Sequence, residues 1–398
     1  MTEDPGRSNS GIHDVCPTSE VRAPSPPPPI GILAELTHRC PLGCPYCSNP
    51  LALDARDNEL DTQTWARVFR EAVALGVMHV HLSGGEPGAR RDLEEITAAA
   101  HASGLYTNLI TSGVGITAAR LGRLSEAGLD HVQISIQDSE PASADHIANY
   151  RGAFARKKEL AAAVRRLKIP LTVNAVMHRA NIERIGAMVE LAMALGGSRV
   201  EIAHVQYYGW ALRNRAALMP TAAQTARAIE TVEDLRKRHL GEIVIDAVLP
   251  DYHARFPKPC VGGWGRRSLN VTPSGKVLPC HAAETLALEF WSVRDHSLAD
   301  IWTSSPSFNA FRGTDWMQQP CRSCARREVD FGGCRCQAFA LTGVAQATDP
   351  VCHLSPLHER VVRLAASGRD APYSYRIFET AGSRNKPGDR PDAESGYF

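Results

Sequence analysis

The sequence predicts an α/β fold, a partial (β/α)6 TIM-like barrel followed by a cysteine-rich domain. Two observations support this prediction. Between Gly31 and about Val248, short runs of β-branched residues alternate with segments of helical periodicity. Past Pro250 the alternation stops, and seven cysteines follow within about ninety residues. Six β/α units in series favour a parallel sheet covered by helices, and right-handed crossovers curl such a sheet into a barrel or partial barrel.

The elements of the barrel follow from the hydrophobic pattern. Strands are expected at residues 32–37, 77–82, 105–111, 131–136, 171–177 and 199–205. Helices are expected at residues 62–75, 92–102, 118–127, 155–167, 182–195 and 222–239. In the first helix, apolar residues recur at helical spacing from Trp65 to Ala72, and Asp61 is positioned to cap the N-terminus.

Composition divides the chain into four segments. Residues 1–29 are rich in Pro, Ser and Gly and are expected to form a disordered arm that ends in a polyproline stretch. The barrel is assigned to residues 30–250 and the cysteine-rich domain to residues 251–370. Residues 371–398 are expected to form a tail that is flexible at its end.

Length and charge exclude several classes of protein. With 398 residues, 43% hydrophobic residues and a net charge of +1, the chain has the composition of a globular protein and no basic excess for nucleic acid or an anionic membrane. It has no apolar run long enough to span a bilayer, and its start lacks the basic and apolar regions of a signal peptide. A cytoplasmic protein is therefore expected. Its eleven cysteines are then reduced thiols and metal ligands, with Cys16 a free thiol in the arm.

A short cysteine-rich loop follows the first predicted strand. Cys40, Cys44 and Cys47 form a C-x3-C-x2-C array, and the two prolines and one glycine between them favour a loop over a helix. Three thiolates are one fewer than the usual four-cysteine iron–sulfur site or a closed zinc site needs. An iron–sulfur cube held by three cysteines keeps one iron open for a small-molecule ligand. The alternative is a zinc knuckle or an accidental cluster of buried thiols.

Polar residues also fall at the ends of the other predicted strands. In β/α barrels the active site gathers at the carboxyl ends of the strands. Ser83-Gly-Gly-Glu-Pro87 leaves the end of the second strand, and by itself it is typical of a tight strand-to-helix turn. Later strands carry further polar candidates for the same rim, namely Asn108, Ser135, Gln137, Asn174, His204 and Tyr207.

The stretch from Arg39 to Ser48, with aromatic Tyr46 before the last cysteine, resembles the signature of radical S-adenosylmethionine (SAM) enzymes. In that superfamily the open iron of a 4Fe–4S cluster binds SAM, and the reduced cluster cleaves SAM to a 5′-deoxyadenosyl radical. The resemblance implies that Cys40, Cys44 and Cys47 hold this cluster and that Tyr46 lies near the adenine. The remaining SAM contacts that it implies are Gly84, Gly85 and Glu86, the last facing the methionyl amine, and the hydrogen-bonding candidates Asn108, Ser135, Gln137 and Asn174.

The later cysteines resemble the SPASM extension of peptide-modifying radical SAM enzymes. That extension has the pattern C-x9–15-G-x4-C, then C-x2-C-x5-C-x3-C, then a last cysteine. One central position falls here on Asp330 instead of cysteine, and Cys336 is an extra thiol. The resemblance implies two auxiliary iron–sulfur clusters, of which one can be 2Fe–2S. One cluster would use Cys260, Cys280, Cys334 and Cys336, and the other would use Cys321, Cys324, Asp330 and Cys352. The alternative is two structural zinc sites.

The resemblance is closer to one family within this superfamily. Residues 33–51, 206–212 and 321–339 look like the PqqA peptide cyclase family of pyrroloquinoline quinone (PQQ) biosynthesis, over about residues 30–358. The resemblance implies a radical SAM oxidoreductase that joins the γ-carbon of a glutamate to a tyrosine ring in the peptide PqqA. It also implies a peptide chaperone, PqqD, and an electron donor such as flavodoxin.

The sequence leaves the catalytic residues unassigned. The reaction needs a base, and His204, Tyr207 and Tyr208 at the predicted rim are candidates only. One rival function is another SPASM peptide maturase, forming thioethers or formylglycine, against which Asp330 and the Cys334–Cys336 pair count. The other rival is a non-catalytic, zinc-stabilised peptide-binding module.

Overall fold

The computed structural model describes residues 26–248 and 251–377. Within them, one nine-stranded sheet has the order β7-β6-β5-β4-β3-β2-β1-β8-β9. Cys16, most of the predicted arm and residues 378–398 of the predicted tail lie outside the described residues. Residues 26–29 pack on the body, since the carbonyl oxygen of Pro27 accepts a hydrogen bond from Trp302 Nε1 (3.1 Å).

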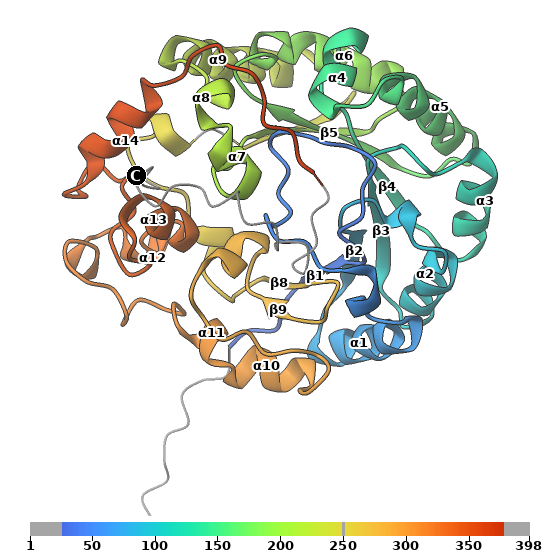
Figure 1. Ribbon diagram of the computed structural model, residues 1–398, viewed down its shortest axis with the longest axis horizontal. Helices are drawn as coiled ribbons and strands as arrows, with labels where there is room; N and C mark the ends of the chain where they lie inside the picture. The colour runs from blue at the N-terminus through green and yellow to red at the C-terminus, as the bar shows by residue number, and fades with distance from the viewer. Residues whose placement is uncertain (1–25, 249–250, 378–398) are drawn as a thin grey trace, which may run out of the picture.

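Seven neighbouring strands are parallel and curl around a common interior (Figure 1). They are β1 (Gly31–Glu35), β2 (His79–Ser83), β3 (Tyr106–Thr111), β4 (His131–Ser135), β5 (Leu171–Met177), β6 (Arg199–His204) and β7 (Val244–Val248). The parallel α/β sheet is confirmed, and all six predicted strands are present. Strand β7 was not predicted, because this short edge strand exposes Val244 and Val248 and lacks a strong apolar pattern.

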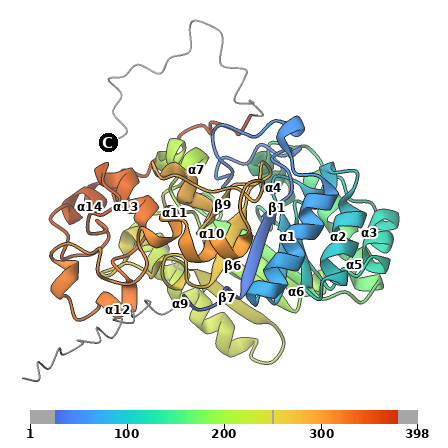
Figure 2. The same ribbon diagram turned by 90° about the horizontal axis from the view of Figure 1, so that it is seen from below.

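Helices cover the outside of the parallel strands (Figures 1 and 2). They are α1 (Thr62–Leu75), α2 (Leu93–Ala102), α3 (Ala118–Glu126), α5 (Ala153–Arg166), α6 (Ile185–Ala194) and α9 (Ala222–Arg238). Helix α4 (Pro141–Ala148) lies at the end of the barrel (Figure 2), where Ala148 O accepts a hydrogen bond from Gly43 N (2.8 Å). Helix α1 begins where Asp61 accepts a hydrogen bond from Thr64 N (2.7 Å). Because strand side chains alternate, Ile32 and Ala34 pack under the helices while Glu35 faces the interior.

The cysteine-rich part continues the same sheet. Strand β8 (Ser268–Val271) pairs with β1 in parallel, and β9 (Val277–Leu278) pairs with β8 antiparallel. The short helices around it are α7 (Gly209–Arg213), α8 (Arg215–Leu218), α10 (Leu298–Ser304), α11 (Pro306–Asn309), α12 (Arg327–Asp330), α13 (Arg335–Thr342) and α14 (His358–Ala365). The sequence did not predict that this part extends the barrel sheet, because strand pairing over such a sequence distance leaves no local pattern.

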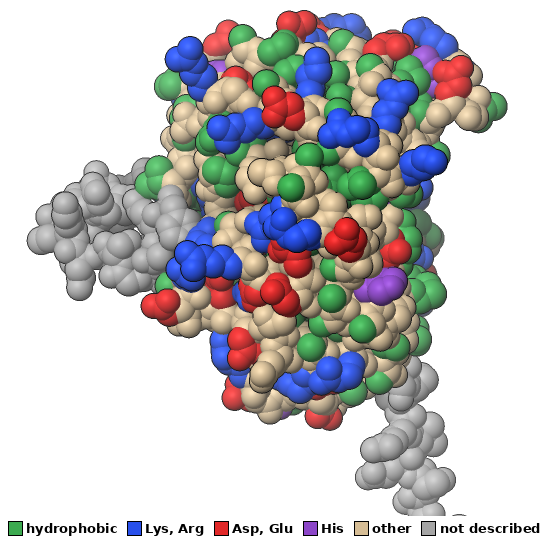
Figure 3. Space-filling view, turned by 90° about the vertical axis from the view of Figure 1, so that its right-hand side faces the viewer, with side chains coloured by type: hydrophobic (Ala, Val, Ile, Leu, Met, Phe, Trp, Pro, Cys, Tyr) green, Lys and Arg blue, Asp and Glu red, His purple; other side chains and the backbone are tan. Residues whose placement is uncertain are grey.

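The surface agrees with the small net charge. Figure 3 shows basic and acidic side chains interspersed on the face turned to the viewer, with hydrophobic side chains scattered between them. Among the described helices, none has the length and apolar character needed to cross a bilayer.

Candidate functional site

The cysteine loop leaves β1 at the open end of the barrel. The loop is fixed by main-chain hydrogen bonds from Gly43 N to Ala148 O (2.8 Å) and from Cys47 N to Cys44 O (3.2 Å). Burial raises the pKa values of the Cys40 and Cys44 thiols to about 12. Three partly buried thiols on one short loop fit an iron site, because bound iron supplies the positive charge that keeps them as thiolates.

Gly84 and Gly85 lie directly against the cysteine loop. A Cβ at Gly84 would lie 2.3 Å from Thr37 O, and a Cβ at Gly85 would lie 2.4 Å from Arg39 O. Main-chain bonds join the same segments, with Gly85 N donating to Thr37 O (2.5 Å) and Glu86 N to Arg39 O (2.7 Å). The sequence assigned these glycines to SAM binding. The contacts show that they also let the end of β2 pack on the loop that carries the cysteines.

The Glu86 carboxylate is buried and already has four protein donors. They are Thr111 Oγ1 (2.9 Å), Ser112 N (2.7 Å), Ser112 Oγ (2.5 Å) and Gly88 N (2.9 Å). Burial raises its pKa above the ordinary value despite these hydrogen bonds. The expected partner of this carboxylate was the methionyl amine of SAM. That contact stays a prediction, and the hydrogen bonds of Glu86 to protein donors join the turn after β2 to the end of β3.

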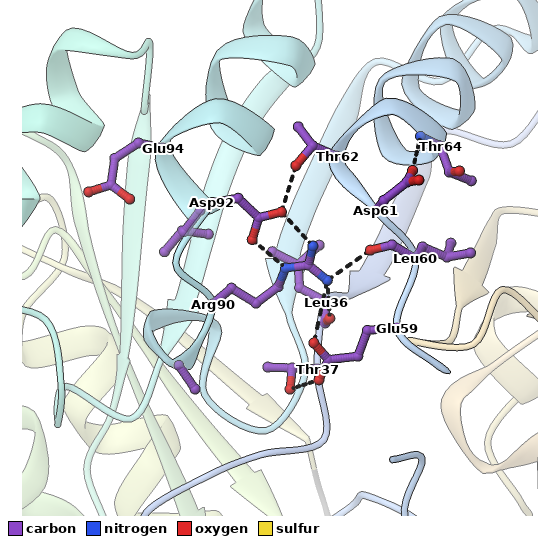
Figure 4. A network of polar contacts seen from close by, with 12 residues as sticks. Leu36, Thr37, Glu59, Leu60, Asp61, Thr62, Thr64, Arg90, Asp92 and Glu94 are labelled. Carbon is purple, nitrogen blue, oxygen red and sulfur yellow. Dashed lines mark hydrogen bonds and ion pairs between the residues drawn. The ribbon is translucent and has the colours of Figure 1, made fainter. Parts of the chain in front are cut away.

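A second polar network supports the loop from below (Figure 4). The Arg90 guanidinium is 5% exposed and donates to Asp92 (2.6 and 2.9 Å), to Leu36 O (3.2 Å) and to Leu60 O (2.9 Å). Asp92 also accepts from Thr62 Oγ1 (2.6 Å). Arg90 therefore ties the residue after β1 to the start of α1 and to the approach to α2, which holds the base of the cysteine loop in place.

A buried lysine, which the sequence did not single out, lies on the barrel side of the loop. Lys157 Nζ on α5 donates to Ser135 O (2.7 Å) and to Gln137 Oε1 (2.6 Å), and burial lowers the pKa of Lys157 to about 8. Gln137 Nε2 in turn lies 3.9 Å from Cys44 Sγ. Gln137 is thus turned toward a thiol of the cysteine loop, and Lys157 joins it to Ser135 at the end of β4.

The other two amide candidates lie lower in the barrel. Asn108 Nδ2 is 2.9 Å from His81 Nδ1, and Asn174 Nδ2 donates to Glu201 Oε2 (2.8 Å). Asn108 Oδ1 is buried without a hydrogen-bond partner among the described residues. This oxygen is free to accept a hydrogen bond from a ligand, whereas the Asn174 amide is already engaged with Glu201.

The first set of auxiliary cysteines forms a closed ring of contacts. The Cys260 thiol interacts with Cys280 and Cys334, and the Cys336 thiol interacts with the same two. Cys260 and Cys336 are buried, and apolar side chains such as Trp264 and Phe311 surround the group. Four thiols in a dry pocket match the ligand number of a four-cysteine iron–sulfur cluster.

The second set lines a separate small cavity. Cys321, Cys324, Asp330 and Cys352 all face it. The Asp330 carboxylate also accepts from Gly332 N (3.1 Å) and pairs with Arg326 Nε (3.3 Å). The structure therefore brings together the same two groups of four that the resemblance implies, and their binding of iron–sulfur clusters remains a proposal.

A cavity of about 710 Å³ opens between the cysteine loop, α7 and the first auxiliary set. Its lining includes Leu51, Tyr208, Arg213, His281 and Phe339. Of the three candidate bases, Tyr208 alone lines it. His204 packs near Lys258 and His253, and Tyr207 packs against Tyr252 at 5.0 Å between ring centroids.

A histidine–carboxylate pair at this cavity was missed as a functional pair. His281 Nε2 contacts the Glu35 carboxylate, which is buried at the end of β1. Asn270 Nδ2 on β8 also donates to Glu35 (3.3 Å). The contact depends on the pairing of β8 with β1, so no sequence motif could reveal it.

Comparison with known proteins identifies the family. The Radical SAM superfamily matches residues 34–192, and an iron–sulfur cluster-binding domain, SPASM, matches residues 260–325. A PqqA peptide cyclase of Methylocella silvestris is 68% identical over 343 residues, which is 86% of this chain and 92% of that protein. A PqqA peptide cyclase of Methylobacterium sp. is 61% identical over 89% of this chain and 94% of that protein. The chain belongs to the PqqA peptide cyclase family.

Solved structures agree with the fold of this PqqA peptide cyclase family member. Streptococcus suis SuiB bound to S-adenosylmethionine has a TM-score of 0.70 at 19% identity, over 82% of this chain and 78% of that chain. Native anSMEcpe with bound AdoMet has a TM-score of 0.58 at 14% identity, over 85% and 99%. The chain thus shares the overall fold of these two proteins.

Proposed function

We propose that this PqqA peptide cyclase family member joins the γ-carbon of a glutamate to the ring of a tyrosine in the peptide PqqA. The observation that supports this most is a cavity that lies between the end of the three-cysteine loop and residues next to the first four-cysteine group. When SAM and the cluster are bound at Cys40, Cys44 and Cys47, they supply the 5′-deoxyadenosyl radical. Such a strong oxidant is needed because the glutamate methylene is unactivated.

The bond changes balance when the peptide loses one hydrogen atom to the 5′-deoxyadenosyl radical and then one electron and one proton. A Cγ–H bond of the glutamate breaks and its hydrogen becomes part of 5′-deoxyadenosine. The carbon radical adds to the tyrosine ring, and the ring then loses one electron and one proton to recover aromaticity. The chain must therefore bind the peptide, accept a proton and provide an acceptor for the electron.

The cavity beside the cysteine loop is the proposed peptide site. Its volume of about 710 Å³ lies in the usual range for a ligand pocket, and it is mostly apolar. Arg213, Arg215 and Arg360 line it. Their positive charge suits a substrate with an acidic side chain, and the apolar lining suits an aromatic ring.

The first auxiliary group is the proposed electron acceptor. His281 and Ala282 follow Cys280 directly and line the cavity, as do Phe339 and Ala340 on the helix that carries Cys336. The second group faces a different cavity. Of the two groups, the first therefore offers the shorter path from a tyrosine ring bound in the cavity.

For the proton, Tyr208 and the Glu35–His281 pair are the polar groups closest to the place of reaction. Tyr208 is half-buried near Cys280, Cys336 and Glu35 and close to Cys47, so it lies between the cysteine loop and the first auxiliary group. We assign no catalytic base among them. PqqD and an electron donor such as flavodoxin are proposed as separate partners.

Two rival functions were open from the sequence. The identity of 61–68% to PqqA peptide cyclases over most of the chain does not favour a thioether- or formylglycine-forming maturase. It does not favour a non-catalytic zinc module either.

The proposal is tested by anaerobic reconstitution with iron and sulfide, followed by addition of SAM, reductant, PqqA and PqqD. The expected result is a brown protein with iron at three sites, 5′-deoxyadenosine, and a peptide lighter by two hydrogens. A Cys44→Ala variant is the matched control and should form neither product. Formation of 5′-deoxyadenosine without the lighter peptide would show that PqqA is not the substrate. A colourless, zinc-loaded protein inert to SAM would reject the radical SAM assignment itself.

A further inference from the structure

After Cys352, the last residue of the two auxiliary groups, the chain returns to the cysteine loop. Figure 1 shows the segment after α14 crossing the barrel and ending beside the loop that follows β1. We call residues 369–377 the C-terminal strap. Arg369 N donates to Ala216 O (2.9 Å), Ser374 N to Asn214 Oδ1 (2.7 Å), and Arg376 N to Gly43 O (3.0 Å). The strap is thus bonded to α8 at one end and to the cysteine loop at the other.

One side chain holds the cysteine loop and the strap together from the α7–α8 junction. Asn214 Nδ2 donates both to Pro45 O (2.9 Å) and to Ser374 O (2.8 Å). Two aromatic residues of the strap pack on histidines of the barrel. Tyr373 lies 6.2 Å from His178 and Tyr375 lies 6.0 Å from His146, between ring centroids. The position of the strap is therefore fixed by several independent contacts.

The strap places a buried cation beside the thiols. Arg376 is 5% exposed, and its Nη2 donates to His38 O within the loop. Its charge acts on the Cys44 and Cys47 thiols and lowers their pKa values, against the larger effect of burial. Buried guanidinium groups normally pair with a carboxylate, because an unpaired buried charge is costly. Among the ion pairs within residues 26–248 and 251–377, none involves Arg376.

The same side chain keeps a free donor. Arg376 Nε is buried and has no hydrogen-bond partner within the described part of the chain. A buried N–H of a charged group without an acceptor is rare in folded proteins. Both the charge and this N–H therefore call for an anionic acceptor next to Cys44 and Cys47. The described protein atoms do not supply one.

We propose that Arg376 is a contact of the iron–sulfur and SAM site, contributed by the C-terminal strap. Its guanidinium offsets the negative charge of the thiolate-bound cluster, and its free Nε–H donates to an anion there. That anion is either a sulfide of the cluster or the carboxylate of SAM. This inference rests on the proposed function, because it needs a cluster at Cys40, Cys44 and Cys47. By this proposal, the iron site is complete only when the C-terminal strap has folded back onto the cysteine loop.

The proposal predicts how the cluster responds when the charge is removed. Reduction adds a negative charge, so loss of a nearby cation makes reduction less favourable. In Arg376→Gln the midpoint potential should shift to a lower value. At the midpoint potential of the wild-type protein, less than half of this cluster should then be reduced. Arg376→Lys keeps the charge and should keep most of the wild-type potential.

The experiment is a redox titration of the full-length reconstituted chain, followed by electron paramagnetic resonance. The cluster of interest is the one whose signal changes when SAM is added, which separates it from the auxiliary clusters. The SAM dissociation constant is measured on the same samples. The control is Arg369→Gln, which removes an exposed arginine from the same strap. Control and wild type should agree in both quantities.

The outcomes separate the two possible anions and the failure of the proposal. A lower potential without SAM in Arg376→Gln identifies the cluster as the partner. An unchanged potential with a raised SAM dissociation constant identifies the SAM carboxylate. Loss of the cluster in Arg376→Gln but not in Arg376→Lys also supports a charge contact. No change in either quantity, or equal loss of the cluster in both variants, would overturn the proposal. A wild-type protein without any SAM-responsive cluster would instead refute the proposed function.

Discussion

Gly85 offers a test of how the turn after β2 is built. The side chain of Gly85→Ala would place its Cβ 2.4 Å from Arg39 O and 2.6 Å from His38 O. Both neighbours are main-chain atoms of the cysteine loop, so neither can rotate away. An ordinary contact between carbon and a carbonyl oxygen is about 3.3–3.6 Å, so the loop and the turn must separate by about 1 Å.

This separation sets the expected cost. It breaks the hydrogen bonds from Gly85 N to Thr37 O and from Glu86 N to Arg39 O. Two hydrogen bonds contribute about 1 kcal/mol each, and an overpacked methyl group costs a further ~1–3 kcal/mol. We therefore expect Gly85→Ala to lower the free energy of unfolding by about 3–5 kcal/mol.

The assay is urea unfolding of the iron-free chain followed by tryptophan fluorescence, so that ligand effects are absent. Gly122→Ala is the matched control, because Gly122 lies inside α3 and a Cβ there meets nothing within 4 Å. This control should gain up to about 1 kcal/mol from better helix propensity. If Gly85→Ala unfolds at the same urea concentration as wild type and loses only SAM binding, the packing role argued here is wrong.

Three further predictions concern single charged side chains. Burial raises the pKa of Asp92, but Arg90 and Thr62 lower it more, to about 2 from an ordinary 3.8. The Asp92 carboxylate thus stabilises the fold above about pH 4, and its contribution fades toward pH 2. Asp92→Asn should cost ~1–2 kcal/mol at pH 6 and nothing near pH 2 in urea unfolding. Asp330→Cys should keep its iron but shift the potential of that auxiliary cluster, since thiolate is a stronger donor than carboxylate, whereas unchanged redox spectra would contradict its role as a ligand. Arg213→Ala should raise KM for PqqA severalfold and leave peptide-independent SAM cleavage unchanged; equal KM values for this variant and an Arg238→Ala control would reject the peptide site.

Local patterns in the sequence predicted the strands, the helices and the grouping of the later cysteines. The spacing of apolar residues placed the six strands and their helices, because burial on one face leaves a period in the sequence. The resemblance to the SPASM extension grouped Cys260 with Cys280, Cys334 and Cys336, and the structure brings these four thiols together. The grouping could be proposed before the structure because the cysteines follow the pattern of a known family.

Contacts between distant segments could not be predicted in the same way. Arg376 and His38 are 338 residues apart, and Glu35 meets His281 only because β8 pairs with β1. Neither contact leaves a periodic pattern or a characteristic residue spacing in the sequence. The packing of Gly85 on the cysteine loop was also missed, because a glycine followed by a glutamate is equally typical of a ligand-binding turn and of a tightly packed turn. The missed contacts are thus those between segments that lie far apart in the sequence.

The most direct test of the proposed function follows one hydrogen atom. PqqA carrying deuterium on the γ-carbon of the reacting glutamate is incubated with the reconstituted chain, SAM, reductant and PqqD, and both products are analysed by mass spectrometry. The proposal predicts deuterium in 5′-deoxyadenosine together with a peptide cross-linked between that carbon and the tyrosine ring. Deoxyadenosine that carries no deuterium, alongside a peptide that keeps all of it, would contradict the proposal.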